Sequence, residues 1–300
     1  MEIGSKCFND HRDDVEGVRC EKACCISAED RFMASTTIET MEVEELKGDE
    51  EDLHAGLMIP LPLTKLNLPS TANNAKNLNL AVLVAAGSFN PPTYMHLHMF
   101  ESGREALLAH GYHVMGGYMS PANSAYVKQG LISAEHRIRM CQLVAEGSSF
   151  IMVDPWEALQ TTYQRTLKVL ARVTGALQHI ASNFGSMRVF LLCGADLLES
   201  FTIPGVWLPD HVEKICRDYG LVCLHRGGRN LRNLIQNCEL LAKHQENIIV
   251  VDNFESEISS TRVRENLSKL LPVDDLTPTC VIDYITSHGL YNVPQRSKSS

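Results

Sequence analysis

The residues with the clearest chemical potential lie in AAGSFNPPTYMHLHMFE, residues 85–101, directly after the apolar run NLNLAVLV. Gly87 lets the backbone turn sharply and lets a ligand approach without a Cβ atom in the way. Ser88 and Phe89 then offer backbone N–H groups, and His96 falls where a helix is expected to begin, near its positive dipole end. Together these groups suit an anionic ligand, most naturally a phosphate. The alternative is a proline-stiffened turn with a surface histidine.

A second stretch, EISSTRVRENL at residues 257–267, has the same chemical character and also follows an apolar run. Its three consecutive hydroxyl residues, Ser259 to Thr261, can each cap a helix. Arg262 and Arg264 are expected in the first turn of that helix, where the dipole disfavours a cation unless an anion is bound there. The stretch therefore predicts a polyphosphate site, and the alternative is an ordinary capped helix with surface arginines.

Other common phosphate and metal motifs do not fit the sequence. It contains no GxxxxGK[ST], which argues against a P-loop NTPase, and no GxGxxG behind a strand, which argues against a dinucleotide-binding dehydrogenase. His96 and His98 are two residues apart, so on a helix they would point to different faces and would not form a zinc pair.

The alternation of apolar and amphipathic segments from residue 78 onward predicts the elements that position both stretches. Strands are expected at runs such as LNLAVLVAA, MRVFLLCGAD and NIIVVD, with helices between them, including a long one from about Leu159 to Ser182. This pattern predicts an α/β domain with a mostly parallel sheet and helices on both faces. In such sheets ligands bind outside the carboxyl ends of the strands, which is where both stretches fall.

Residues 1–76 differ in composition and are predicted to form an acidic, poorly ordered leader before one domain at residues 77–300. The leader holds 16 acidic and 8 basic residues and so carries most of the net charge of −9. Such a segment buries too little apolar area to offset its ordering entropy. Its cluster of Cys20, Cys24 and Cys25 lacks the paired spacing and nearby histidines of a zinc site.

Composition also sets expectations for location and partners. No apolar run is long enough to predict a membrane span, and the N-terminus lacks a secretory signal pattern. The ten cysteines are scattered and suggest a reducing compartment, with the cytoplasm expected first and the nucleus second. No basic stripe predicts a nucleic-acid partner.

GSFNPPTYMHL and ISSTRVR together resemble the (H/T)xGH and ISSTxxR signatures of the nucleotidylyltransferase superfamily. Thr93 stands where many members have histidine, Met95 where they have glycine, and His96 matches the final histidine. This Thr-x-x-His form is similar to the eukaryotic nicotinamide mononucleotide adenylyltransferases. WEALQTTYQRTLKVL, LLCGADLLESF and VWLPDHVEKICRDYGLVCLHRGG agree, so the resemblance covers about residues 78–292.

The resemblance implies a Rossmann-like nucleotidylyltransferase fold with a set of residues that bind ATP phosphates. His96 would bind these phosphates and stabilise the charge that develops as the α-phosphate is attacked. Lys128 would reach a nucleotide phosphate, and Thr261 and Arg264 would hold the β- and γ-phosphates. The further members of this set are Ser260 and Arg226.

The resemblance also implies where the bases and riboses bind. Tyr163 and Thr166 would surround the nicotinamide, and Trp207, which follows Val206 in GVW, would stack on the pyridine ring. The residues implied for the nucleotide floor and for the adenosine and ribose contacts are Gly87, Ser88, Phe89, Gly194 and Asp196.

The implied reaction joins ATP and nicotinamide mononucleotide to give NAD and pyrophosphate, with Mg²⁺ held mainly by substrate oxygens and water and no metal site formed by the protein. Nicotinic acid mononucleotide is expected to be accepted too, and a homo-oligomer remains open. One rival is another superfamily activity, a pantetheine-phosphate or cytidylyl transferase, against which Tyr163 and Trp207 argue. The other rival is a non-catalytic nucleotide sensor or chaperone-like protein on the same fold, against which the full set of phosphate residues argues.

Overall fold

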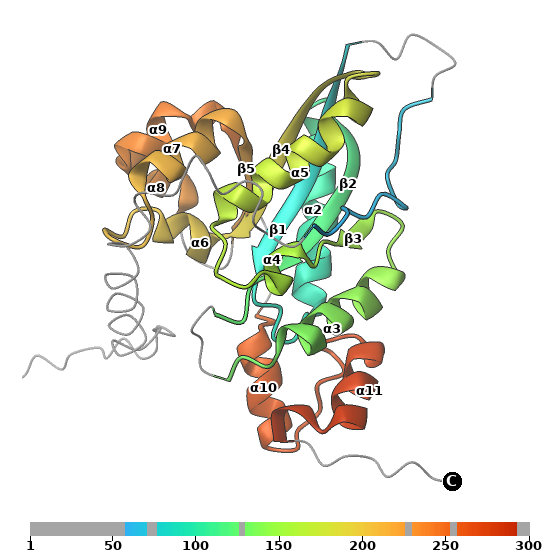
Figure 1. Cartoon of the computed structure of the whole chain (residues 1–300). Coiled ribbons are helices and arrows are strands. Elements are labelled where there is room, and N and C mark those ends of the chain that lie inside the picture. The colour runs from blue at the N-terminus through green and yellow to red at the C-terminus, as the bar shows by residue number, and fades with distance from the viewer. Residues whose placement is uncertain (1–57, 71–76, 126–129, 226–229, 253–256, 293–300) are drawn as a thin grey trace, which may run out of the picture.

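A six-stranded parallel sheet forms the centre of the protein in the computed structural model, which describes residues 58–70, 77–125, 130–225, 230–252 and 257–292 (Figure 1). The strands lie in the order β3-β2-β1-β4-β5-β6, and each neighbouring pair is parallel. Their bounds are β1 Leu78–Gly87, β2 His113–Pro121, β3 Ile151–Val153, β4 Gly185–Gly194, β5 Gly220–Leu224 and β6 Ile248–Val251. The predicted α/β fold is confirmed.

Helices lie between the strands and cover both faces of the sheet. Their bounds are α2 Tyr94–Ala109, α3 Ala134–Glu146, α4 Trp156–Leu159, α5 Thr166–Ala181, α6 Ala195–Ser200, α7 Pro209–Asp218, α8 Leu231–Asn237, α9 Glu239–Lys243, α10 Ser260–Ser268 and α11 Thr279–His288, with 3₁₀ helices η1 Gln245–Asn247 and η2 Leu290–Asn292. None of the helices in the described ranges is long and apolar enough to cross a membrane.

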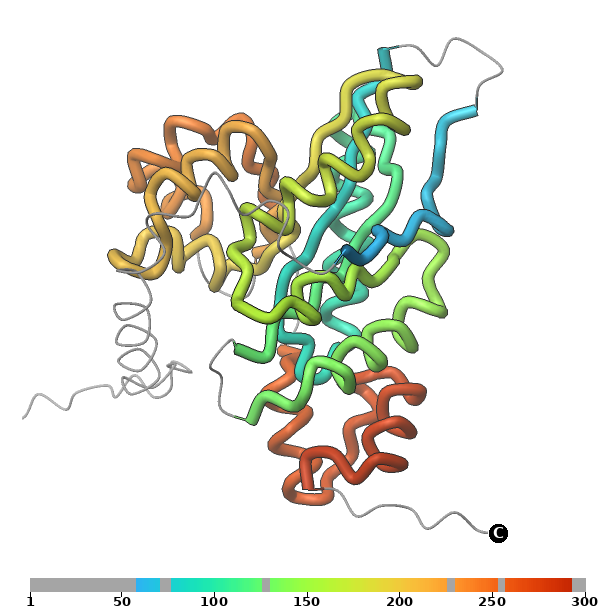
Figure 2. The backbone as a smooth tube through the Cα atoms, in the orientation of Figure 1, coloured from blue at the N-terminus to red at the C-terminus, as the bar shows by residue number. Residues whose placement is uncertain are grey.

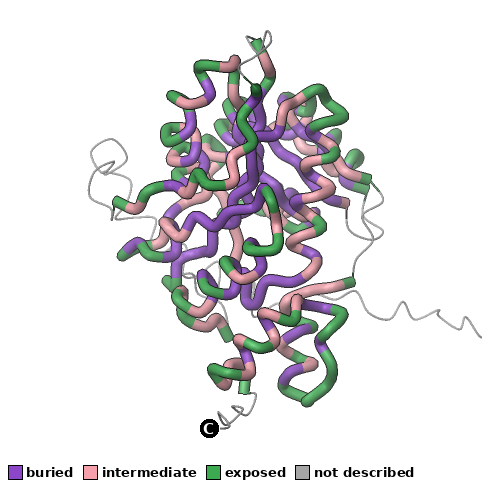
Figure 3. The backbone as a smooth tube through the Cα atoms, turned by 90° about the vertical axis from the view of Figure 1, so that its right-hand side faces the viewer, coloured by how far each residue is buried: buried purple, intermediate pink, exposed green. Residues whose placement is uncertain are grey.

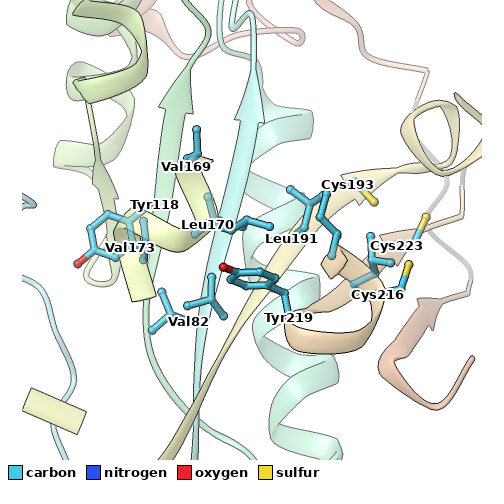
Figure 4. Close-up of a cluster of buried hydrophobic side chains, with 14 of the residues drawn as sticks. Val82, Tyr118, Val169, Leu170, Val173, Leu191, Cys193, Cys216, Tyr219 and Cys223 are labelled. Atoms are coloured by element: carbon cyan, nitrogen blue, oxygen red, sulfur yellow. The ribbon is translucent and has the colours of Figure 1, made fainter. Parts of the chain in front are cut away.

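Strand β1 is apolar on both faces because helices cover both sides of the sheet. Leu80 and Val82 pack in a cluster with α5 and α7, whereas Ala81 and Leu83 pack in a second cluster with α2. Side chains of a strand alternate between its two faces, and a parallel sheet buries both. Figure 3 shows this buried core running through the strands, and Figure 4 shows Val82 among the side chains of the first cluster.

A third apolar cluster joins α3 to α10 and α11 near the carboxyl end of the sheet (Figures 1 and 2). Its fully buried side chains include Met140 of α3, Val263 of α10, and Val281 and Ile285 of α11. Through this cluster, the last helices of the chain are brought to the strand ends at which the first sequence stretch lies.

The predicted domain boundary at residue 77 lies too late, because residues 58–70 pack along the sheet beside β2 and β3 (Figure 1). We call residues 58–70 the edge segment. Leu61 is only 8% exposed in the first core cluster. The Asn67 amide donates to the Met115 carbonyl over 2.7 Å. The composition of residues 1–76 as a whole did not indicate this packing. The acidic residues that define the leader all precede the edge segment.

The rest of the predicted leader, including Cys20, Cys24 and Cys25, lies outside the described residues. The free cysteines of the described ranges are Cys141, Cys193, Cys216, Cys223, Cys238 and Cys280.

The long helix predicted from Leu159 to Ser182 begins only at Thr166, as α5, because residues 160–165 form a loop after the short helix α4. Two neighbouring β-branched residues, Thr161 and Thr162, lower the helix propensity there. The Asn123 side chain also donates to the Gln160 carbonyl over 2.6 Å, which holds the chain in a loop. Tyr163 therefore lies in a loop instead of a helix.

Candidate active site

The site residues predicted from the two sequence stretches meet at the carboxyl ends of β1 and β4, where the strand order reverses direction. Val84 of β1 pairs with Leu191 of β4, so Gly87 and Gly194 end their strands on the same edge. The connections from β1 and β4 leave this edge on different sides of the sheet, which is the arrangement at which α/β sheets bind nucleotides.

The turn after β1 is held by contacts from distant parts of the chain. Asn90, which is fully buried, donates from Nδ2 to the Gly130 carbonyl over 2.8 Å. Its Oδ1 accepts from the Tyr291 hydroxyl over 2.7 Å. Phe89, which is 2% exposed, adopts a φ of 45°, and a residue in this left-handed region needs such support from its surroundings.

His96 is the third residue of α2 and closes a reciprocal capping box with Thr93, as its predicted place at the helix start requires. The Thr93 amide donates to His96 Nδ1 over 3.0 Å, and Thr93 Oγ1 lies 2.8 Å from the same nitrogen. Because a backbone N–H can only donate, Nδ1 is the acceptor and the neutral ring carries its proton on Nε2. The imidazole is thus set to donate a hydrogen bond from the side away from the cap.

The second stretch lies against this turn although more than 160 residues separate the two in sequence. Ser260 Oγ donates to the Pro91 carbonyl over 2.7 Å, and Arg264 Nη1 donates to the Asn90 carbonyl over 2.8 Å. Arg264 Nη2 is 3.3 Å from Thr261 Oγ1. The three predicted residues Ser260, Thr261 and Arg264 therefore gather at one place beside the turn.

The prediction that Arg264 falls in the first helical turn is wrong by one residue. Helix α10 begins at Ser260, so Arg264 is its fifth residue, and the capping residue is Ser259, whose side chain accepts from the Arg262 amide over 3.1 Å. The guanidinium still reaches the helix start, because its side chain returns to Thr261.

The residues predicted for the bases and riboses come from the segments that follow β3 and β4. Tyr163 lies in the loop between α4 and α5, and Thr166 is the first residue of α5. Asp196 is exposed in the first turn of α6. Trp207 is fixed in orientation, because its Nε1 donates to Ser200 Oγ over 2.9 Å.

The Trp207 ring also meets the edge of Phe201 at 4.7 Å between centroids, and the neighbouring Val206 is 39% exposed. The pyridine contacts of Tyr163, Thr166 and Trp207 stay predictions. Two further predicted residues, Lys128 and Arg226, lie outside the described residues.

Sequence reasoning missed Arg137, a fully buried arginine in the first turn of α3. It donates to the Ile132, Ser88 and Ala122 carbonyls over 3.0, 3.0 and 2.7 Å. A signal for it existed, because Arg137 shares the i, i+3, i+7 spacing of the buried Met140 and Val144 and so must face inward.

Sequence reasoning also missed a buried polar group behind the loop that carries Tyr163. Glu157 is 4% exposed and accepts from Ser120 Oγ over 2.9 Å. Burial raises the pKa of this carboxyl to about 8, so it is mostly protonated at neutral pH. Asn123 Nδ2 donates to the Gln160 carbonyl over 2.6 Å and to the Glu157 carbonyl over 3.3 Å. These hydrogen bonds connect the loop to the end of β2.

Comparison with known proteins agrees with this geometry. The cytidylyltransferase-like family matches residues 84–266, a span that contains both stretches. Over 237 residues the chain is 51% identical to a nicotinamide/nicotinic acid mononucleotide adenylyltransferase of Arabidopsis thaliana, covering 78% of this chain and 98% of that protein. The protein of the same name from Oryza sativa subsp. japonica is 52% identical over 237 residues, covering 78% of this chain and 95% of its own length.

Among solved structures, a nicotinic acid mononucleotide adenylyltransferase of Plasmodium falciparum complexed with NaAD is similar with a TM-score of 0.51. It shares 19% sequence identity, and the match covers 71% of this chain and 98% of that one, which supports the fold. On the extent of the family match and the identity to full-length relatives, the chain belongs to the cytidylyltransferase-like family and, within it, to the nicotinamide/nicotinic acid mononucleotide adenylyltransferases.

Proposed function

We propose that this protein transfers the adenylyl group of ATP to nicotinamide mononucleotide or nicotinic acid mononucleotide, forming NAD or its deamido form and pyrophosphate. The observation that carries the proposal is the contact between the two stretches, in which Arg264 and Ser260 bind the carbonyls of the turn that leads to His96. Names of relatives that are about half identical to this chain support the substrates.

The reaction needs positioning and charge stabilisation more than acid–base chemistry. An oxygen of the mononucleotide 5′-phosphate attacks the α-phosphorus of ATP, and the bond from that phosphorus to the bridging oxygen breaks as pyrophosphate leaves. The attacking phosphate is already an anion, so no strong general base is required. His96, with its proton on Nε2, would donate to the α-phosphate, and Arg264 and Thr261 would hold the leaving group.

Mg²⁺ belongs to the proposal as an ion that enters with ATP. The side chains gathered beside the turn offer imidazole, hydroxyl and guanidinium donors, which suit phosphate oxygens and not a divalent cation. The ion would therefore be held by phosphate oxygens and water, and it would reduce the charge of the triphosphate.

The test is to incubate the purified full chain with ATP and Mg²⁺ and with each pyridine mononucleotide in turn, and to assay NAD and its deamido form. Formation of either product together with pyrophosphate is the expected result. Two control reactions replace ATP by CTP, or the mononucleotide by phosphopantetheine. Turnover only in one of these controls, or in none of the reactions, would overturn the proposal.

Three further expectations stay predictions. They are a cytoplasmic location with the nucleus as the alternative, the absence of a nucleic-acid partner, and possible assembly as a homo-oligomer.

A further inference from the structure

Packing alone does not explain why Arg137 is buried. Its side chain is fully buried in the first turn of α3, where the helix dipole disfavours positive charge. Burial lowers the pKa of its guanidinium from the usual value. Burying such a group is costly, so its presence calls for a role that an apolar side chain could not fill.

The three carbonyls that Arg137 binds belong to three separate segments of the site edge. Ser88 lies in the turn after β1, beside Gly87 and Phe89. Ala122 follows the end of β2. Ile132 lies in the segment before α3.

Each of these segments leads to residues predicted to bind the nucleotides. The segment of Ile132 follows Lys128 closely in sequence. Asn123, next to Ala122, holds the Gln160 carbonyl and so the loop that carries Tyr163. One guanidinium therefore fixes the relative positions of the phosphate turn and two segments beside it.

Within the described part of the chain, no ion pair compensates the charge of Arg137. Among the described residues, no carboxylate lies within ion-pair distance of it, and its hydrogen-bond acceptors are backbone carbonyls. The buried carboxyl nearby, Glu157, has a pKa raised to about 8 and is mostly neutral at pH 7. A positive charge thus remains behind a turn where anionic phosphates are expected to bind.

We propose that Arg137 is a positioning residue for the adenylyl-transfer site, which holds the Ser88 turn, the end of β2 and the segment before α3 in one geometry and places a buried positive charge behind them. The proposal rests on the proposed function for its kinetic consequences, but its structural consequences do not. A displacement of about 1 Å in a reacting group can lower a rate by about 100-fold, so small shifts of these segments should be measurable.

The test compares Arg137→Lys and Arg137→Met with Lys65→Met in the full chain. Lys65 is a matched control, because it too donates to three backbone carbonyls, at Ala145, Ser148 and Ile151, but away from the predicted site residues. For each variant the melting temperature, kcat and both KM values are measured, with kinetics at a temperature at which every variant is folded. Amide hydrogen exchange is followed without substrate in the segments of Ser88, Ala122 and Ile132.

We expect all three variants to melt at lower temperature, but only the Arg137 variants to lose kcat, by about 10-fold or more for Arg137→Met and less for Arg137→Lys. Exchange should become faster in the three segments of the Arg137 variants and stay unchanged there in Lys65→Met. A folded Arg137→Met with kcat, KM and exchange within twofold of the parent would overturn the proposal. If Arg137→Met does not fold, parental kinetics and exchange in Arg137→Lys would overturn it.

If the parent itself has no adenylyltransferase activity, the proposed function fails. The exchange comparison then still decides whether Arg137 positions the three segments.

Discussion

A cationic side chain lies at each end of helix α3. The local electrostatics favours the cation at one end and disfavours the cation at the other. Lys65 of the edge segment donates to the Ala145 and Ser148 carbonyls at the C-terminus of α3, over 2.6 and 2.9 Å. A cation there satisfies unpaired carbonyls and agrees with the helix dipole. Arg137 lies at the opposite end, against the dipole and without a carboxylate contact among the described residues.

This difference extends to the two regions that the cations serve. Beside the edge segment, Arg172 donates to the Ile59 carbonyl over 2.6 Å and pairs with Asp154 at 3.1 Å, so its charge is balanced. The site edge instead gathers Arg137 and Arg264 around the carbonyls of one turn. The edge segment thus places its cations where carbonyls and a carboxylate favour them, whereas the site edge holds its cations where only the predicted phosphate site gives them a function.

The largest expected effect is on stability and comes from removing the edge segment. A chain that starts at Asn77 should have a free energy of unfolding about 4 kcal/mol lower than one that starts at Met58, because it loses the burial of Leu61 and the hydrogen bonds of Lys65 and Asn67. Urea unfolding of both chains measures the difference. Equal stability would mean that the edge segment contributes nothing, and the comparison would fail.

At the site edge the expected effect is on turnover. His96→Ala should lower kcat by about 100-fold or more, on the scale of losing one preorganised donor to the reacting phosphate. It should cost only about 1 kcal/mol of stability, through the lost capping bond from the Thr93 amide. Steady-state kinetics and urea unfolding check both values, and near-normal turnover of the folded variant would exclude this role for His96.

Arg264→Ala should have a smaller effect on turnover, about 30-fold in kcat, and should weaken ATP binding while the KM for the mononucleotide stays nearly unchanged. The reason is that charge on the pyrophosphate grows as it leaves, so the guanidinium acts more strongly in the transition state. Arg264→Lys should recover only part, because an ammonium cannot make a bidentate contact. Varying each substrate in turn separates these effects.

A rise in the KM for ATP with an intact kcat would instead make Arg264 a uniform binding contact.

The last expected effect concerns pH and Glu157. The folded state keeps the Glu157 proton up to a pKa of about 8, while an unfolded glutamate loses it near about 4.3. The folded state therefore binds more protons in between, and this carboxyl makes stability fall with rising pH by up to about 1.4 kcal/mol per pH unit. Glu157→Gln should lack that fall, which urea unfolding between about pH 5 and pH 8 measures. Equal slopes in the two proteins would show that Glu157 is ionised and able to compensate Arg137.

Much of the fold could be predicted from the sequence, because apolar runs alternate with amphipathic segments at spacings that few folds accept. The positions of His96 and Thr261 at helix starts followed from local capping chemistry. The edge segment could not be recognised as part of the folded domain, because its proline-containing sequence has no hydrophobic periodicity and its packing depends on contacts with β2. The break before Tyr163 depends on Asn123, which is 37 residues away from Gln160.

Arg137 was overlooked for a related reason. Its inward spacing is visible, but its carbonyl partners come from segments whose proximity only the tertiary structure defines.

The turn after β1 is completed by the last part of the described chain, and this has a consequence for synthesis on the ribosome. Thr277 Oγ1 donates to the Pro92 carbonyl, and the Tyr291 hydroxyl donates to Asn90 Oδ1, across 185 and 201 residues of sequence. A nascent chain can build β1, β2 and α2 early, but the acceptors of this turn remain unpaired until partners 185 and 201 residues later have emerged. The site edge can therefore close only after translation has passed Tyr291, so products of synthesis interrupted between β6 and Tyr291 contain the sheet but lack a finished nucleotide turn.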